Sequence, residues 1–212
     1  MATHYDDEAQ AEQLKTWWKE NWKALAAGLV IGLGAIFGWE GWQNHQQQRA
    51  ADASQMYEDL KQALSDGKSD AAKALADKLI ADYAGTPYAA GAQLRMAAEA
   101  VKTEALDDAT ARLQWVREHA KDEGLRQVAQ LRAARVQWQQ GKLDDALKTL
   151  DGETGAFAPL FDELRGDIKL AQGDRGAARS AYEKAYAATP EDQPSRQLLQ
   201  RKLDDLADTV QS

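Results

Sequence analysis

One short pattern, present four times, constrains the fold of this chain more than any other feature. Its clearest version is GKLDDA (residues 141–146), and related runs are GKSDAA (67–72), LDDA (106–109) and GDRGAA (173–178). In most versions a glycine can end one helix, and the alanine is small enough for two helices to pack closely. Between the runs, apolar residues recur at helical spacing, without strand-like alternation. The sequence therefore predicts an all-α fold of repeated helix pairs.

The spacing of the pattern indicates the kind of repeat. Its alanines are 37, 37 and 32 residues apart, close to the roughly 34-residue period of tetratricopeptide (TPR) repeats. For residues 43–212 we therefore predict a TPR-like α-solenoid of about four helix pairs with a C-terminal capping helix. The expected helices cover residues 44–65, 70–83, 87–103, 107–120, 123–140, 144–150, 158–172, 175–188 and 194–208.

The turn residues have predicted structural roles. We assign such roles to Gly67, Ala72, Ala109, Gly141, Ala146, Gly173 and Ala178. The glycines should form left-handed helix caps, and Asp70, Asp107 and Asp144 should cap the helices that follow. Glu104 stands where the other turns have glycine, so this turn fits the pattern less well. The loosest connection, and the expected hinge, is the segment 151–158.

An uncharged run, ALAAGLVIGLGAIFGW, occupies residues 24–39 of a chain whose mean hydropathy is only -0.63. Extended to Trp22 and Trp42, a helix would span about 30 Å, the thickness of a bilayer core, with tryptophans at both interfaces. We predict an uncleaved transmembrane signal-anchor helix at 23–42. A cleaved signal peptide fits less well, because five acidic residues precede the run and no small-residue cleavage site follows it. A buried core helix also fits less well, because it would not need tryptophans at both ends.

The basic residues around this run predict its orientation. Lys15, Lys19 and Lys23 precede it, whereas the nearest basic residue on the other side is Arg49. Basic flanks stay in the cytoplasm during insertion. We expect a single-pass type II protein of the bacterial inner membrane, with a cytoplasmic tail at residues 1–22 and a periplasmic domain from residue 43.

Four glycines in the run are candidates for helix contacts within the membrane. Gly28 with Gly32, and Gly34 with Gly38, form two G-x-x-x-G pairs on different faces of the helix. Such spacing lets another helix approach the backbone closely. Glycine is also common in membrane helices generally, so the pattern alone leaves both interpretations open.

The composition argues against several chemistries. Cysteine is absent, which removes disulfides, thiolate metal sites and thiol nucleophiles. A net charge of -8 disfavours nucleic-acid binding. His4, His45 and His119 lack a second ligand at metal-binding spacing, and no phosphate loop or nucleophile motif is present. The sequence predicts no cofactor and no enzymatic activity.

Two tryptophans of the repeat region are candidate groove residues. Trp115 and Trp138 could anchor an extended client chain, or fill the core between helices, which is the more frequent role in a solenoid. The arginines and lysines of helices 123–140 and 158–172 are interpreted as an ordinary solvated face. Function should then come from the concave surface of the array.

The order of these parts resembles the YfgM-like ancillary SecYEG translocon subunits. The resemblance rests on WWKENWKALA (residues 17–26), the glycine-rich anchor ending in Gly38-Trp39, and the TPR-like repeats. Further similar stretches are ARV (134–136) with DDALKTLD (144–151), and DELRGD (162–167) with GDRGAARSA (173–181). The resemblance implies a single-span inner-membrane protein that associates with SecYEG and a PpiD-type membrane-anchored periplasmic chaperone, and passes emerging chains to periplasmic chaperones. It implies no catalytic residues.

Two hypotheses about function follow. The first is a translocon-associated adaptor whose repeat domain binds a partner chaperone or an unfolded secreted chain. Its tether raises the local concentration of a weak binding surface. The second is a membrane-anchored scaffold for envelope assembly or cell division that holds folded partners without binding client chains. An enzyme with an unrecognised site is a third alternative, which the missing motifs disfavour.

Overall fold

The computed structural model describes residues 3–152 and 155–208, and these residues form helices without strands. The predicted all-α class is thereby confirmed for this part of the chain. Contacts divide the chain into two units, Met1–Ala51 and Asp52–Ser212. We describe each unit by itself.

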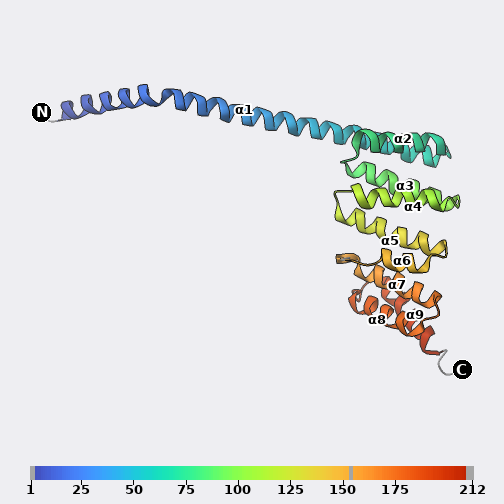
Figure 1. Ribbon diagram of the computed structural model, residues 1–212. Helices are drawn as coiled ribbons and strands as arrows, with labels where there is room; N and C mark the ends of the chain where they lie inside the picture. Colours follow the sequence, from blue (N-terminus) through green and yellow to red (C-terminus); the bar gives the residue numbers. More distant parts are fainter. Residues whose placement is uncertain (1–2, 153–154, 209–212) are drawn as a thin grey trace. The chain divides into compact units, whose positions relative to one another are not determined.

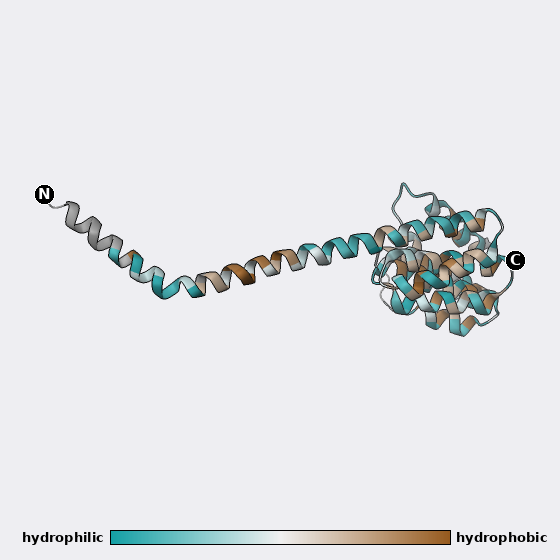
Figure 2. Cartoon of the chain, turned by 90° about the horizontal axis from the view of Figure 1, so that it is seen from above, coloured by the Kyte–Doolittle hydropathy of each residue, from teal (hydrophilic) through white to brown (hydrophobic). Residues whose placement is uncertain are grey.

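The first unit consists of the N-terminal part of helix α1 (Thr3–Ser65). Figure 2 shows its hydrophobic stretch between hydrophilic segments. The large apolar side chains there are well exposed, for example Val30 at 69%, Ile31 at 72% and Trp39 at 65%. Among the described residues, no helix taken singly has both the length and the apolarity to cross a membrane. The helical segments Leu14–Ala24 and Ala26–Ser65 meet at a 42° bend, and taken together they satisfy the criteria of length and apolar composition.

The boundary of this helix differs from the prediction. We expected separate helices at 23–42 and 44–65, whereas the helical backbone of α1 continues through residue 43 to Ser65. Residues 42–65 contain neither glycine nor proline and include four glutamines before residue 50. Because glutamine is a good helix former, nothing in this segment ends the helix.

The second unit is a stack of helix hairpins (Figure 1). After residues 52–65 of α1, its helices are α2 (Ser69–Tyr83), α3 (Pro87–Lys102), α4 (Leu106–His119), α5 (Glu123–Gln139), α6 (Leu143–Thr149), η1 (Gly155–Phe157), α7 (Ala158–Ala171), α8 (Arg175–Ala188) and α9 (Pro194–Asp208). These bounds agree with the expected helices to within one residue at nearly every end, apart from the short η1. The predicted TPR-like solenoid with a C-terminal helix is confirmed.

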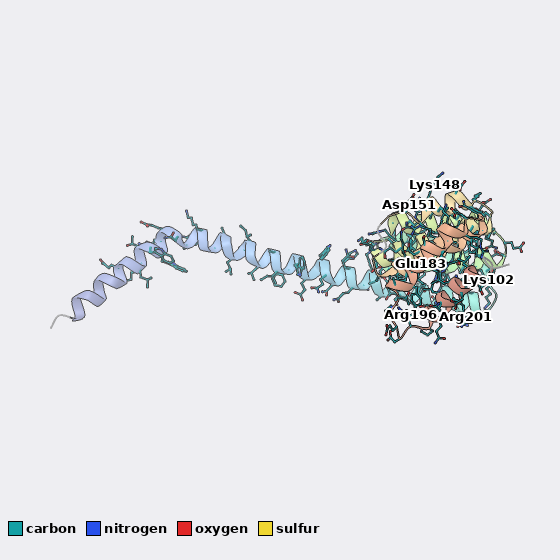
Figure 3. All side chains as sticks on the ribbon, turned by 90° about the horizontal axis from the view of Figure 1, so that it is seen from below. Lys102, Lys148, Asp151, Glu183, Arg196 and Arg201 are labelled. Carbon is teal, nitrogen blue, oxygen red and sulfur yellow. The ribbon has the colours of Figure 1, made fainter. Side chains whose placement is uncertain are left out.

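Successive hairpins share their hydrophobic cores. One face of α3 contributes Ala89 and Met96 to the core with α1 and α2, and another contributes Leu94 and Ala97 to the core with α4 and α5. A helix buried on two faces keeps only a narrow exposed stripe, which limits the surface available for binding. In contrast, the charged side chains of Lys102, Lys148 and Glu183 lie at the periphery of the unit (Figure 3).

The four hairpin turns have one hydrogen-bonding pattern. In the third turn the amide of Lys142 donates to the carbonyl of Gln137 at 2.9 Å, and that of Gly141 to Trp138 at 2.9 Å. Equivalent pairs of bonds close the other three turns. These are Schellman caps, in which one residue adopts a positive φ. That residue is Gly67 (72°), Glu104 (59°), Gly141 (76°) or Gly173 (81°), and so Glu104 occupies the glycine position.

The four aligned alanines, Ala72, Ala109, Ala146 and Ala178, are fully buried. Each donates its amide to the carbonyl of the residue that follows the positive-φ position, at 3.0 Å in every turn. A larger side chain at these positions would separate the two helices of a hairpin.

The predicted caps at three of the turns are wrong. The residues before α2, α4 and α6 are Lys68, Ala105 and Lys142, none of which caps with its side chain. Because the Schellman closure leaves only one residue between the left-handed position and the next helix, Asp70, Asp107 and Asp144 fall inside the first turn. In the last turn an aspartate directly follows the glycine, and its carboxylate does accept the amide of Ala177 at 3.0 Å.

Asp107 and Asp144 instead accept hydrogen bonds from the next turn. Gln140 donates to Asp107 at 3.1 Å, and Gln172 donates to Asp144 at 2.8 Å. Each glutamine directly precedes the glycine of its own turn. The hydrogen bonds therefore connect consecutive repeats along one edge of the stack.

Candidate protein-binding surface

The anchor glycines lie on an open helix surface. Residues Gly28, Gly32, Gly34 and Gly38 are exposed, and a Cβ added at any of them would meet no described atom within 4 Å. Within their unit, nothing packs against them. The backbone there is accessible to another helix, as close helix contacts require.

A groove between α3 and α5 is the clearest candidate surface of the second unit. It contains an open cavity of about 280 Å³, with Ala98, Val101 and Val136 among its lining residues. Arg132 and Arg135 of α5 line the same cavity. We call this cavity with its two arginines the arginine groove. Apolar walls with a few charged groups are characteristic of binding pockets.

The repeat period brings matching residues to the groove. Arg132 and Arg135 follow Arg95 and Ala98 by 37 residues, the spacing of the first three repeat alanines. All four side chains are exposed. Positions three and four residues apart share one face of a helix, so these residues form the exposed stripes of α3 and α5. The basic residues of α5 were predicted to form a solvated face, although the recurrence of arginine at the repeat spacing, at residues 95 and 132, was a signal of a shared surface.

The three arginines are held differently. Arg95 donates from Nε to the hydroxyl of Tyr57 at 2.6 Å, with its guanidinium 5.5 Å from the ring centre. Arg132 donates to the carbonyl oxygen of Leu94 at 3.4 Å. Within the described chain, Arg135 makes no hydrogen bond or ion pair. Most donors of Arg132 and Arg135 therefore remain available to a ligand.

Nearby lysines are neutralised within the fold, unlike these arginines. Lys61 pairs with Glu58 at 2.6 Å, and Lys102 pairs with Glu99 at 3.0 Å. No carboxylate of the described residues forms an ion pair with Arg95, Arg132 or Arg135. The groove is thus a local excess of positive charge in a chain of net charge -8.

The two candidate tryptophans are half-buried. Trp115 packs against the cores on both sides of α3 and stacks on His119, with ring centres 4.7 Å apart. Trp138 packs against the core of α5, α6 and α7. Neither lines the arginine groove. Their contacts favour the core interpretation, while leaving part of each ring at the surface.

The DELRGD stretch forms a polar cluster between α7, α8 and α9. Lys202 lies 2.7 Å from both Glu163 and Asp167, and the hydroxyl of Tyr182 donates to Asp167 at 2.8 Å. Gly166 is required by this arrangement, because a Cβ there would overlap the ring of Tyr182. The cluster fixes the last helix against α7.

The cluster changes the protonation of two of its members. Burial, followed by the hydrogen bond to Asp167, raises the pKa of Tyr182 above its ordinary value. Burial by itself lowers the pKa of Lys202, but its hydrogen bonds to Asp167 and Glu163 outweigh this and raise the pKa. Lys202 therefore stays charged, and the cluster is a structural ion-pair network near the end of the stack.

The histidines named in the sequence have no metal-binding arrangement among the described residues. His45 is exposed, and the Nδ1 of His119 lies 2.9 Å from the carbonyl oxygen of Trp115. Within the described residues no group of three His, Asp or Glu side chains could hold a metal ion. The side chain of His4, and residues 153–154 of the predicted hinge, lie outside the described residues.

Comparison with known proteins covers both units of the chain. Residues 15–208 match the model of the tetratricopeptide repeat-like domain family. The chain is 41% identical to a protein of Escherichia coli over 86% of this chain and 88% of the relative. It is 35% identical to one of Haemophilus influenzae and 32% identical to one of Neisseria gonorrhoeae, each over 97% of this chain and the full length of the relative. All three relatives are named ancillary SecYEG translocon subunits.

Proposed function

Because this chain belongs to the ancillary SecYEG translocon subunits with a tetratricopeptide repeat-like domain, we propose that it is a non-catalytic adaptor at the SecYEG channel. In this proposal the segment 23–42 is the membrane anchor, and residues 43–212 form a periplasmic domain that binds a PpiD-type chaperone and helps transfer emerging chains to periplasmic chaperones. The observation that carries the proposal is the full-length alignment with the relatives from Haemophilus and Neisseria, which includes both the apolar segment and the repeats.

The exposed apolar surface of α1 supports the membrane location. Large side chains such as Ile31 and Phe37, each more than 60% exposed, have no protein partner within their unit. A stretch of this kind is unfavourable in water and favourable in lipid. The three lysines before it, and the lack of lysine and arginine after it as far as Arg49, support a cytoplasmic N-terminus.

The topology can be tested through the absence of cysteine from the sequence. Thr16→Cys and Lys73→Cys variants would each carry a single thiol, before and after the anchor, and leave the three lysines before the anchor in place. In spheroplasts, a membrane-impermeant maleimide should label the thiol at position 73 and not that at position 16. Labelling at position 16 alone would reverse the proposed orientation, and detergent lysis serves as the control for thiol reactivity.

The adaptor role can be tested by affinity capture of the full-length protein from membranes in mild detergent, read by quantitative mass spectrometry. We expect enrichment of SecY and of a PpiD-type chaperone. Enrichment of division or outer-membrane assembly proteins without SecY would instead support the scaffold hypothesis and refute the adaptor.

A second arm of this experiment tests the glycine pairs. Replacing Gly28, Gly32, Gly34 and Gly38 by leucine raises the apolarity of the segment, so membrane insertion should persist. Loss of SecY from the captured material would assign a channel contact to the anchor. The control is Ala26→Leu, which enlarges a small residue of the same segment that lies away from the faces of both glycine pairs, and it should keep the contact.

A further inference from the structure

We propose that the arginine groove binds an acidic, leucine-rich segment of a partner protein. The inference deepens the proposed function, because it rests on the repeat domain being a protein-binding module, and it assigns a location and a ligand chemistry to that binding. It starts from the charge and the walls of the cavity between α3 and α5.

The two arginines of the groove have no carboxylate partner in the described chain. Arg132 and Arg135 line an apolar cavity, and no ion pair within the described chain engages them. Acidic side chains outnumber basic ones in this protein, 34 to 26, and neutralise Lys61 and Lys102 on neighbouring parts of α1 and α3. The planar donors of arginine match two oxygens of a carboxylate, as they also match those of a phosphate. The free donors therefore indicate an acidic ligand.

The shape and polarity of the floor also bear on the ligand. Ala98 and Val101 of α3 and Val136 of α5 leave the cavity without bulky side chains between the two helices. A volume of about 280 Å³ accommodates branched aliphatic side chains, which gain roughly 25 cal/mol for each Å² of apolar surface removed from water. The ligand should thus carry aliphatic residues beside its carboxylates.

The cavity occupies a short part of the stack, because all its lining residues belong to α3, α4 and α5. Beyond it, Lys202 of α9 is already engaged by Glu163 and Asp167 of α7. On the other side, Arg95 keeps its charge, but its Nε donor is used by the hydroxyl of Tyr57. An acidic segment should therefore bind over α3 and α5, where Arg132 and Arg135 have free donors. This restriction favours a short segment over a long unfolded client.

The test uses the full-length protein in detergent and a fluorescein-labelled peptide of repeated Glu-Glu-Leu-Leu, read by fluorescence anisotropy. Matched peptides carry lysine for glutamate or serine for leucine. We expect the acidic leucine peptide to bind, with both matched peptides at least about tenfold weaker. Binding of the acidic peptide should also weaken as salt is raised.

Two variants change the groove in different ways. Arg132→Glu with Arg135→Glu reverses its charge, and Ala98→Trp fills its floor without changing the charge. Both should weaken binding of the acidic peptide by about tenfold or more. Lys73→Glu with Lys78→Glu makes the same charge change at exposed positions of α2 and should stay within about twofold of the parent protein. Circular dichroism checks that every variant remains folded.

Equal binding of the lysine peptide, or parent-like affinity of the charge-reversed variant for the acidic peptide, would overturn the inference. It would also be overturned if the two arginines bound phosphatidylglycerol vesicles and not the peptide. A dimer in light scattering that dissociates on charge reversal would overturn it as well. If SecY is still captured in any of these cases, the inference fails while the proposed function stands. Loss of SecY from the unaltered protein would refute the proposed function itself.

Discussion

Substitution of Glu104 would measure the energetic cost of the left-handed position in the repeated turn. It has a φ of 59° at the position where three other turns have glycine. Its side chain is exposed, and the turn around it keeps the same hydrogen bonds as the others. Glu104→Gly should therefore change the backbone energy of the turn and almost nothing else.

The size of this effect follows from two opposing terms. A left-handed conformation costs an L-residue about 1–2 kcal/mol, which glycine avoids. Glycine in turn loses more conformational entropy on folding, about 0.4–1 kcal/mol. We expect Glu104→Gly to raise the free energy of unfolding by about 0.5–1 kcal/mol, and the melting temperature by about 1–4 °C for a domain of this size.

The reciprocal change is available one repeat later. Gly141→Glu places the same residue at a φ of 76°, where a Cβ would meet no described atom within 4 Å. It should lower the free energy of unfolding by about the amount that Glu104→Gly raises it. Glu104→Ala keeps the backbone cost and should change stability by less than about 0.5 kcal/mol.

Thermal and urea unfolding of the four proteins, followed by far-ultraviolet circular dichroism, would provide these values. Destabilisation by Glu104→Gly would show that the glutamate side chain stabilises the turn. An unchanged Gly141→Glu would show that the left-handed geometry carries no cost in this repeat, and either result would refute the reasoning.

Three further predictions concern the last repeats. Gly166→Ala should destabilise the domain by about 1–3 kcal/mol in urea unfolding, because the added Cβ overlaps the ring of Tyr182. The control is Gly176→Ala, where a Cβ meets only ordinary contacts, and its stability should stay within about 0.5 kcal/mol of the parent protein. Because the folded state raises the pKa of Lys202, its contribution is complete below the unfolded value of 10.5 and is lost as the pH rises through the folded value. Melting temperatures should therefore fall more steeply above this pH in the parent protein than in Lys202→Met. Gln172→Ala should remove the bond to Asp144 and cost about 0.5–1.5 kcal/mol, with no change in capture of SecY.

The sequence predicted the helices and turns well because both have local causes. Glycine or a tolerated substitute sets each left-handed position, and the alanine five residues beyond it sets the approach of the two helices. The error in the caps had an equally local cause. In these four turns an aspartate caps the next helix only where it directly follows the left-handed residue, as Asp174 does, and Asp107 and Asp144 come too late.

The contacts between repeats could not be predicted as well from the sequence. A hydrogen bond from Gln172 to Asp144 joins residues 28 positions apart, and it depends on how one hairpin packs on the next. The same holds for Lys202, which reaches α7 from α9 across 35 positions to Asp167. Amphipathic spacing identifies the buried side of a helix, but it does not say which exposed residue meets which neighbour.

The arginine groove is a feature that amphipathic spacing alone did not identify. Helical spacing marks Arg132 and Arg135 as exposed, and a solvated face is the ordinary interpretation of exposed charge. Two facts from the structure change that interpretation, namely the apolar cavity that these residues line and the missing carboxylate partners. An acidic protein has many carboxylates to place beside a guanidinium, and here the neighbouring lysines receive them. Because surface pairs contribute little to stability, leaving two arginines unpaired costs the fold almost nothing. It also leaves their donors free for the carboxylates of a partner, where an apolar floor excludes water and strengthens the interaction.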